Sequence, residues 1–279
     1  MRIHIAKYEP NRQGGGWSFA RNFAKVMGQT DYNEADVYFI PSPSMVERAE
    51  VEQAKRDGKK IVVRLDNAVR NSRNRNTGMS RMKDFCDWAD LVIYQSEWAK
   101  SYLMDFTKKD GPVILNGVDL DIFKPPRVFK WNYHSTYLYS RYNRDETKGW
   151  EVARYWFSTS AHPTANLIIT GNFSPELIDG NFDFYMGEKV QYYGVVGEEQ
   201  MADLYRQAKY FIYTYFNDAC SNSLTEALCS GCKIAGDGYY RKTGGAPEII
   251  KSFREKGREY FSIDRMVGEY RKAIDGVSL

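Results

Sequence analysis

Two spacings of apolar residues alternate along the chain. Short runs rich in β-branched and aromatic residues, such as Lys60–Leu65, are typical of buried strands. Between them, apolar residues recur three or four positions apart, as in amphipathic helices. This alternation predicts βαβ units and parallel sheets. In the first half we predict strands at Ile3–Lys7, Val37–Ile40, Lys60–Leu65, Leu91–Tyr94 and Val113–Leu115, with helices at Trp17–Met27, Ser44–Lys55, Met79–Trp88 and Glu97–Asp105.

A pair of prolines interrupts the alternation at Phe123-Lys124-Pro125-Pro126-Arg127. Adjacent prolines do not fit inside a helix or a central strand, so this segment predicts a linker between two domains, residues 1–125 and 126–279. In the second half we predict strands at Ser135–Tyr139, Asn166–Thr170, Val190–Tyr193, Tyr210–Thr214 and Lys233–Ala235, with helices at Gly149–Thr159, Glu198–Gln207, Ser221–Cys229, Glu248–Glu255 and Asp264–Asp275.

The fold class that follows is α/β, with two Rossmann-like domains facing each other across a cleft. The last helix is a candidate to pack back on the N-terminal domain. In such sheets ligands bind beyond the carboxyl ends of the strands, so the loops that follow the strands are where we expect a site.

Composition is that of a globular protein, with 43% apolar and 27% charged residues. No apolar run is long enough for a membrane span. The N-terminus lacks the apolar core and cleavage site of a signal peptide. We therefore predict a cytoplasmic protein, in the host cytoplasm if it is viral.

The cysteines do not indicate a metal site. Cys229 and Cys232 have the spacing of half a zinc site, but neither a second pair nor clustered histidines complete it. Together with Cys86 and Cys220 they are expected to be small buried free thiols.

Charge adds one candidate surface. The net charge is +3 and the excess lies in the first half, where the segment Arg64–Lys83 carries six cations and only one acid, Asp66. Such a run is usually a solvated loop. The alternative is a surface that faces an anionic partner such as phosphate, nucleic acid or an acidic glycan.

Glycines separate the first predicted strand from its helix. Gly14, Gly15 and Gly16 precede the helix predicted from Trp17. Glycine lets the backbone approach a ligand at a helix N-terminus, although the spacing here is not that of the dinucleotide-binding fingerprint.

Several segments match one family in order and spacing. They are Asp218-Ala219-Cys220-Ser221-Asn222-Ser223-Leu224-Thr225-Glu226, Asn116-Gly117-Val118-Asp119, Lys148-Gly149-Trp150, Gln95-Ser96-Glu97-Trp98 and Gly244-Gly245-Ala246-Pro247-Glu248. Over nearly its whole length the chain resembles the retaining GT-B glycosyltransferases of GT4 type (glycosyl transferases group 1). The resemblance implies transfer of a sugar from a nucleotide-diphosphate sugar without a metal or another cofactor.

The segment from Asp218 to Glu226 is expected to hold the donor. Glu226 can accept both ribose hydroxyl protons, and charged acceptors make the stronger hydrogen bonds. Asp218 precedes the helix, where it can reach hydroxyls of the transferred sugar, unless it only caps that helix. Free amides at the helix start suit the diphosphate. The donor-binding residues expected here are Ser221, Asn222, Ser223, Leu224, Thr225 and Glu226.

Cations must stabilise the departing diphosphate if no metal does so. By resemblance Lys148 is the phosphate-binding lysine. Arg141, directly after a predicted strand, is the first choice for its arginine partner, and Arg144 is the reserve.

On the first domain, Gly14, Gly15 and Gly16 resemble the family's glycine loop, and Arg64-Leu65-Asp66-Asn67 resembles a strand end found in some members. Asp66 would then orient the acceptor or act as a base. The alternative is an ion pair between Asp66 and a nearby arginine such as Arg64.

Two departures from the family pattern concern specificity. Asp218 stands where glutamate is usual, and the segment Gly236–Thr243 is longer than usual. Both suggest a different donor sugar or a shifted loop.

The predicted function is therefore a retaining glycosyltransferase that uses a UDP-, GDP- or ADP-sugar. The sequence does not identify the acceptor, and the candidates are a glycan, a small molecule and DNA. The alternatives are a viral DNA-base glycosyltransferase and a non-catalytic nucleotide-binding protein on the same fold.

Overall fold

The computed structural model describes residues 1–10, 14–66, 76–128, 135–142, 148–172, 190–236 and 238–277. The chain forms two compact units. Unit 1 comprises Met1–Val118, Asp218–Asn222 and Glu248–Leu279, and unit 2 comprises Asp119–Asn217 and Ser223–Pro247. The sequence division into 1–125 and 126–279 was contiguous, whereas these units interleave along the chain.

Unit 1 contains a four-stranded parallel sheet in the order β1-β2-β3-β4. Its strands are β1 (Ile3–Ile5), β2 (Val37–Ile40), β3 (Lys60–Leu65) and β4 (Leu91–Tyr94). Val37 pairs with both Ile3 and Lys60, so the register runs unbroken across the sheet. The strands are rich in Val, Ile and aromatic residues because both faces of a parallel sheet are buried.

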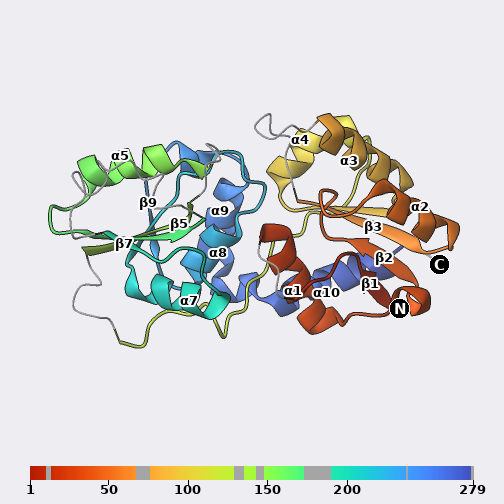
Figure 1. Ribbon diagram of the computed structural model, residues 1–279, viewed down its shortest axis with the longest axis horizontal. Coiled ribbons are helices and arrows are strands. Elements are labelled where there is room, and N and C mark those ends of the chain that lie inside the picture. Colours follow the sequence, from red (N-terminus) through yellow and green to blue (C-terminus); the bar gives the residue numbers. More distant parts are fainter. Residues whose placement is uncertain are drawn as a thin grey trace. The chain divides into compact units, whose positions relative to one another are not determined.

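Helices cover both faces of this sheet (Figure 1). Helices α1 (Gly15–Met27) and α10 (Ile263–Asp275) share one apolar cluster, in which Phe23 and Tyr270 pack on Phe39 of β2. The other face packs on α2 (Arg48–Arg56), α3 (Asn76–Trp88) and α4 (Glu97–Thr107). Phe39 and its neighbour Tyr38 pack on opposite faces of the sheet, because successive strand residues point to opposite sides.

Unit 2 contains a five-stranded parallel sheet in the order β7-β6-β5-β8-β9. Its strands are β5 (Thr136–Tyr142), β6 (Asn166–Gly171), β7 (Val190–Tyr192), β8 (Tyr210–Ile212) and β9 (Lys233–Ala235). The chain builds outward from β5 in one direction and then returns to its other side with β8. The point between β5 and β8 is therefore the topological switch point, where open α/β sheets bind ligands.

The remaining helices are α5 (Trp150–Ser160), α7 (Glu198–Gln207), α8 (Asn222–Cys229) and α9 (Ala246–Lys256), with short 3₁₀ turns at Tyr32–Glu34, Tyr240–Lys242 and Arg258–Phe261. No helix in the ranges given above is both long and apolar enough to cross a bilayer.

Most predicted elements are confirmed to within a few residues, and two differ. The strand predicted at Val113–Leu115 is a single bridge between Val113 and Tyr94. The helix predicted from Ser44 begins at Arg48, because Ser42 and Ser44 form a turn in which the Met45 amide donates to the Ser42 carbonyl.

Candidate functional site

The loop after β5 brings Lys148 to the switch point of unit 2. The Lys148 carbonyl accepts a hydrogen bond from the Tyr139 hydroxyl at 2.9 Å. Thr214 Oγ1, with a single proton, lies 2.9 Å from the Gly149 carbonyl oxygen and 3.2 Å from the Lys148 carbonyl oxygen. Gly149 has φ +69°, and a Cβ there would lie 2.3 Å from the Thr214 carbonyl oxygen. Only glycine fits this approach, so Lys148 is fixed beside the loop that follows β8.

The Lys148 side chain is buried and lies near an aromatic ring. Its Nζ is 5.7 Å from the ring centroid of Tyr215, and only 7% of the residue is exposed. Tyr215 is held in turn, since its hydroxyl donates to the Ser140 carbonyl at 2.5 Å. A cation is therefore positioned at the carboxyl edge of the sheet.

The predicted arginine partner of Lys148 stays a prediction. Arg141 is part of β5, but its side chain is outside the described atoms, and Arg144 lies outside the described residues.

Helix α8 places Glu226 against a buried tyrosine. The Tyr205 hydroxyl lies 3.3 Å from Glu226 Oε2 and 3.1 Å from the Ser223 carbonyl oxygen. Its single proton can be donated to only one of these two acceptors at a time. Burial, and then the Glu226 charge, raise the pKa of Tyr205 well above its usual value. Tyr205 therefore remains a donor that can orient the predicted ribose-binding carboxylate. The sequence gave no signal for this role, because Tyr205 reads only as an apolar position of the amphipathic helix α7.

The start of α8 is mostly buried. Ser221 and Ser223 are 1% and 4% exposed, and Leu224 and Thr225 are fully buried. The side chains of Leu224 and Thr225 belong to the core, so any contact of theirs with a donor would be made through the backbone.

Three loops meet at the carboxyl edge of the sheet in unit 1. Gly14 (φ 131°) precedes α1, and Gly15 opens it. A Cβ on Gly16 would lie 2.7 Å from Met45 Sδ and 3.7 Å from Asp66 Oδ2. The glycine loop after β1 is thus packed against the turn after β2 and the end of β3, where Asp66 stands.

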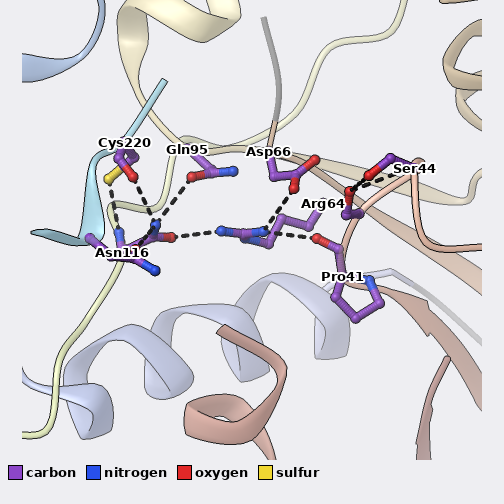
Figure 2. A network of polar contacts seen from close by, with 9 residues as sticks. Pro41, Ser44, Arg64, Asp66, Gln95, Asn116 and Cys220 are labelled. Carbon is purple, nitrogen blue, oxygen red and sulfur yellow. Dashed lines mark hydrogen bonds and ion pairs between the residues drawn. The ribbon is translucent and has the colours of Figure 1, made fainter. Parts of the chain in front are cut away.

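Arg64 lies in the strand predicted at Lys60–Leu65, but it is not part of the solvated face that the basic run indicated. It lies in β3 and is 2% exposed. Figure 2 shows its guanidinium between Asn116 and Pro41, with hydrogen bonds of 3.1 Å to Asn116 Oδ1 and 2.8 Å to the Pro41 carbonyl. Its Nη1 is 4.0 Å from Asp66 Oδ2, so the predicted alternative of an Arg64–Asp66 ion pair is present.

Asn116 is the residue on which most of this network converges. Its Nδ2 carries two protons and lies within hydrogen-bond distance of three acceptors, Asn222 Oδ1 at 2.8 Å, Gln95 Oε1 at 3.1 Å and the Cys220 carbonyl oxygen at 3.2 Å. Its backbone amide also contacts Cys220 Sγ at 3.4 Å. The sequence placed Asn116 only in one of the segments that match the family, because partners so distant along the chain leave no local signal.

The described remainder of the basic run is also engaged with protein groups. Arg81 pairs with Glu47 at 3.2 Å, and Lys83 pairs with Asp87. Arg70, Arg73 and Arg75 lie outside the described residues.

All four cysteines are free and buried, as predicted. Burial raises the pKa of Cys86 and of Cys220 to about 12, so both are neutral thiols at physiological pH. Asp218 stands two residues before Cys220, and its charge contributes to that shift.

No protein-family model and no curated protein matches the chain. Solved structures do. HepE of Anabaena in complex with UDP-glucose has a TM-score of 0.76 at 12% identity, covering 99% of this chain and 100% of HepE. Sucrose-phosphate synthase of Thermosynechococcus elongatus has a TM-score of 0.64 at 16% identity, covering 92% and 76%. AviGT4, a glycosyltransferase involved in avilamycin A biosynthesis, has a TM-score of 0.60 at 14% identity, covering 99% and 98%.

At such identities the likeness establishes the fold. Together with the two parallel sheets it confirms the predicted class, α/β of GT-B type with two Rossmann-like domains.

Proposed function

We propose that the protein is a retaining glycosyltransferase that moves a sugar from a nucleotide-diphosphate sugar to a hydroxyl acceptor without a metal. The observation that carries the proposal is the fixed Lys148 at the switch point of an open parallel sheet, next to the loop after β8. The same sheet carries α8 with Glu226.

In this proposal each part of the donor meets a different group. Glu226, oriented by Tyr205, accepts from the ribose hydroxyls. Lys148 and the first amides of α8 face the diphosphate. The fold likeness supports this division, because HepE was crystallised with UDP, with UDP-glucose and with UDP and glucose.

Transfer breaks the bond between the anomeric carbon and the diphosphate oxygen, and the electron pair goes to the diphosphate. Lys148 stabilises the charge that develops there. The acceptor hydroxyl forms the new bond, and its proton leaves to a base. By the resemblance, Asp218 would bind hydroxyls of the transferred sugar, and Asp66 would orient the acceptor hydroxyl or take its proton.

UDP-, GDP- and ADP-sugars remain the candidate donors. An anionic partner such as DNA would have to bind through Arg70, Arg73 and Arg75, because Arg64, Arg81 and Lys83 already contact protein groups. We therefore keep a hydroxyl acceptor of unspecified class as the main proposal.

Nucleotide binding and donor hydrolysis test the proposal together. Thermal shift and calorimetry with UDP, GDP and ADP should reveal one nucleotide that stabilises the wild type. Lys148→Met and Glu226→Gln should each weaken its binding about 10- to 100-fold, the loss expected for a charged hydrogen-bonding partner.

Lys251→Met is the matched control for Lys148, because Lys251 is exposed and pairs only loosely with Glu255 at 4.0 Å. Equal binding in the wild type and both site variants, or no hydrolysis of any sugar conjugate by the wild type, would refute the proposal.

A further inference from the structure

The loop that carries Asp218 has an unusual place in the chain's architecture. Residues Asp218–Asn222 belong to unit 1, although the residues before and after them belong to unit 2. The loop is buried there, with Ala219, Cys220 and Ser221 each at most 5% exposed. A buried loop needs partners for its polar backbone groups.

Asn116 supplies a partner for one of them, the Cys220 carbonyl, and contacts two side-chain atoms of the loop as well. Its side-chain amide donates to the Cys220 carbonyl and to Asn222 Oδ1, and its backbone amide contacts Cys220 Sγ. One residue thus contacts the loop at three atoms, on the C-terminal side of Asp218.

Arg64 determines which way the Asn116 amide points. A guanidinium only donates hydrogen bonds, so the Asn116 oxygen must face Arg64 Nη2. The nitrogen then faces Gln95, Cys220 and Asn222, all of which present oxygen atoms to it. Figure 2 shows this order, from Pro41 through Arg64 to Asn116 and Cys220.

Arg64 itself cannot turn freely. Its guanidinium carbon lies 3.7 Å above the Phe19 ring, and Nη1 is tied to the Pro41 carbonyl. The same Nη1 is 4.0 Å from Asp66 Oδ2. One buried cation therefore contacts the carboxylate expected at the acceptor and the amide that holds the loop expected at the donor sugar.

We infer that Asn116 is a positioning residue. Together with Arg64 it fixes where the loop bearing Asp218 lies relative to Asp66. This inference rests on the proposed function for the roles of the two acids. It adds that their placement is set by one amide whose orientation a buried arginine dictates.

Asn116→Ala tests the inference, with Gln29→Ala as the matched control. Gln29 is also an amide of unit 1 that bonds backbone atoms, the amide and carbonyl of Ile5, but it lies outside the network. Hydrogen exchange of the segment 218–222 should accelerate about 10- to 100-fold in Asn116→Ala, whereas exchange in α7 should not change. In Gln29→Ala, exchange of the segment 218–222 should stay at the wild-type rate.

Activity provides the second readout. With whichever of UDP-, GDP- or ADP-glucose the wild type hydrolyses, kcat of Asn116→Ala should fall about 10- to 100-fold while KM stays within about twofold. A residue that only stabilised the fold would leave kcat per folded molecule unchanged.

Unchanged exchange at 218–222 in Asn116→Ala, or faster exchange with an unchanged kcat, would overturn the inference. If that variant does not fold, Asn222→Ala removes one acceptor of the same amide, and exchange at 218–222 must still accelerate. If the wild type binds and hydrolyses no donor, the proposed function fails, and the exchange result alone decides whether Asn116 holds the loop.

Discussion

Arg64 carries a full positive charge at a position that is 2% exposed. A buried charge is tolerated only when it is paired and hydrogen-bonded, and here Pro41, Asn116 and Asp66 provide that environment. Removing the cation would take a hydrogen bond from the Pro41 carbonyl and from Asn116 Oδ1, and the nearby positive charge from Asp66.

Arg64→Met should therefore lower the free energy of unfolding by about 3 to 5 kcal/mol. Urea denaturation measures this loss. The control is Arg2→Met, because Arg2 forms an exposed pair with Asp36 at 3.3 Å and should cost less than about 1 kcal/mol. Equal losses in the two variants would show that the buried contacts of Arg64 contribute no more than a surface pair.

At the scale of elements, α4 depends on the residue that directly precedes it. Ser96 is the N-cap, fully buried, and its Oγ accepts a hydrogen bond from the Ala99 amide at 3.0 Å. Ser96→Ala should cost about 1 kcal/mol of stability, with a range of about 0.5 to 2 for such caps. Ser101→Ala, in the exposed interior of the same helix, should change stability by less than about 0.5 kcal/mol in the same urea titration. A neutral Ser96→Ala would contradict the capping role.

The turn between β5 and α5 depends on glycine for a different reason. Gly149→Ala would place a Cβ 2.3 Å from the Thr214 carbonyl at a positive φ. It should lower stability by about 1 to 3 kcal/mol and weaken nucleotide binding, because Lys148 would move away from the loop after β8. Gly197→Ala is the control, since nothing lies within 4 Å of a Cβ there and φ is −73°. Nucleotide affinity that survives Gly149→Ala would show that the position of Lys148 does not matter.

Periodicity predicted the elements well because each one depends on residues close in sequence. It failed where contacts between residues far apart in the sequence determine the surroundings of a side chain. Arg64 was placed in its strand, but the basic run that it begins was expected to be solvated, whereas Arg64 is buried against Pro41 and Asn116, 23 and 52 residues away. Tyr205, 21 residues before Glu226, escaped notice for the same reason. The resemblance singled out Lys148 and Glu226 as expected donor contacts, and the structure shows which groups they contact.

At the scale of the molecule, the C-terminal helix completes the core of unit 1. Tyr270 of α10 contacts Phe19, Phe23 and Phe39 at centroid distances of 5.5, 5.3 and 5.8 Å. A chain that ends at Gly257 would expose this aromatic cluster to water. We expect it to lose cooperative thermal unfolding and the near-UV circular dichroism signal of packed aromatics. A native-like melt of the truncated chain would contradict this prediction.

Stability should also fall at alkaline pH. Burial raises the pKa of Cys86 and Cys220 from 9.0 to about 12. Above pH 9 the unfolded chain releases these protons while the folded chain keeps them, so ionisation favours unfolding. The stabilisation is complete below about pH 9 and is lost as pH rises toward 12.

Each buried thiol should lower the free energy of unfolding by about 1 to 2 kcal/mol between pH 8 and pH 10.5. Urea titrations at pH 8 and at pH 10.5 measure the summed loss in the free energy of unfolding. Cys86→Ala should remove part of the difference. An equal free energy of unfolding at both values would show that the thiols titrate normally.

The central claim is that a nucleotide-sugar binds at the carboxyl edge of the sheet in unit 2. A crystal structure of the protein soaked with UDP, GDP or ADP, whichever binds, tests it most directly. We predict density for the diphosphate beside Lys148 and the start of α8, with the ribose hydroxyls on Glu226. A nucleotide bound elsewhere, with Lys148 and Glu226 making no contact to it, would contradict the account.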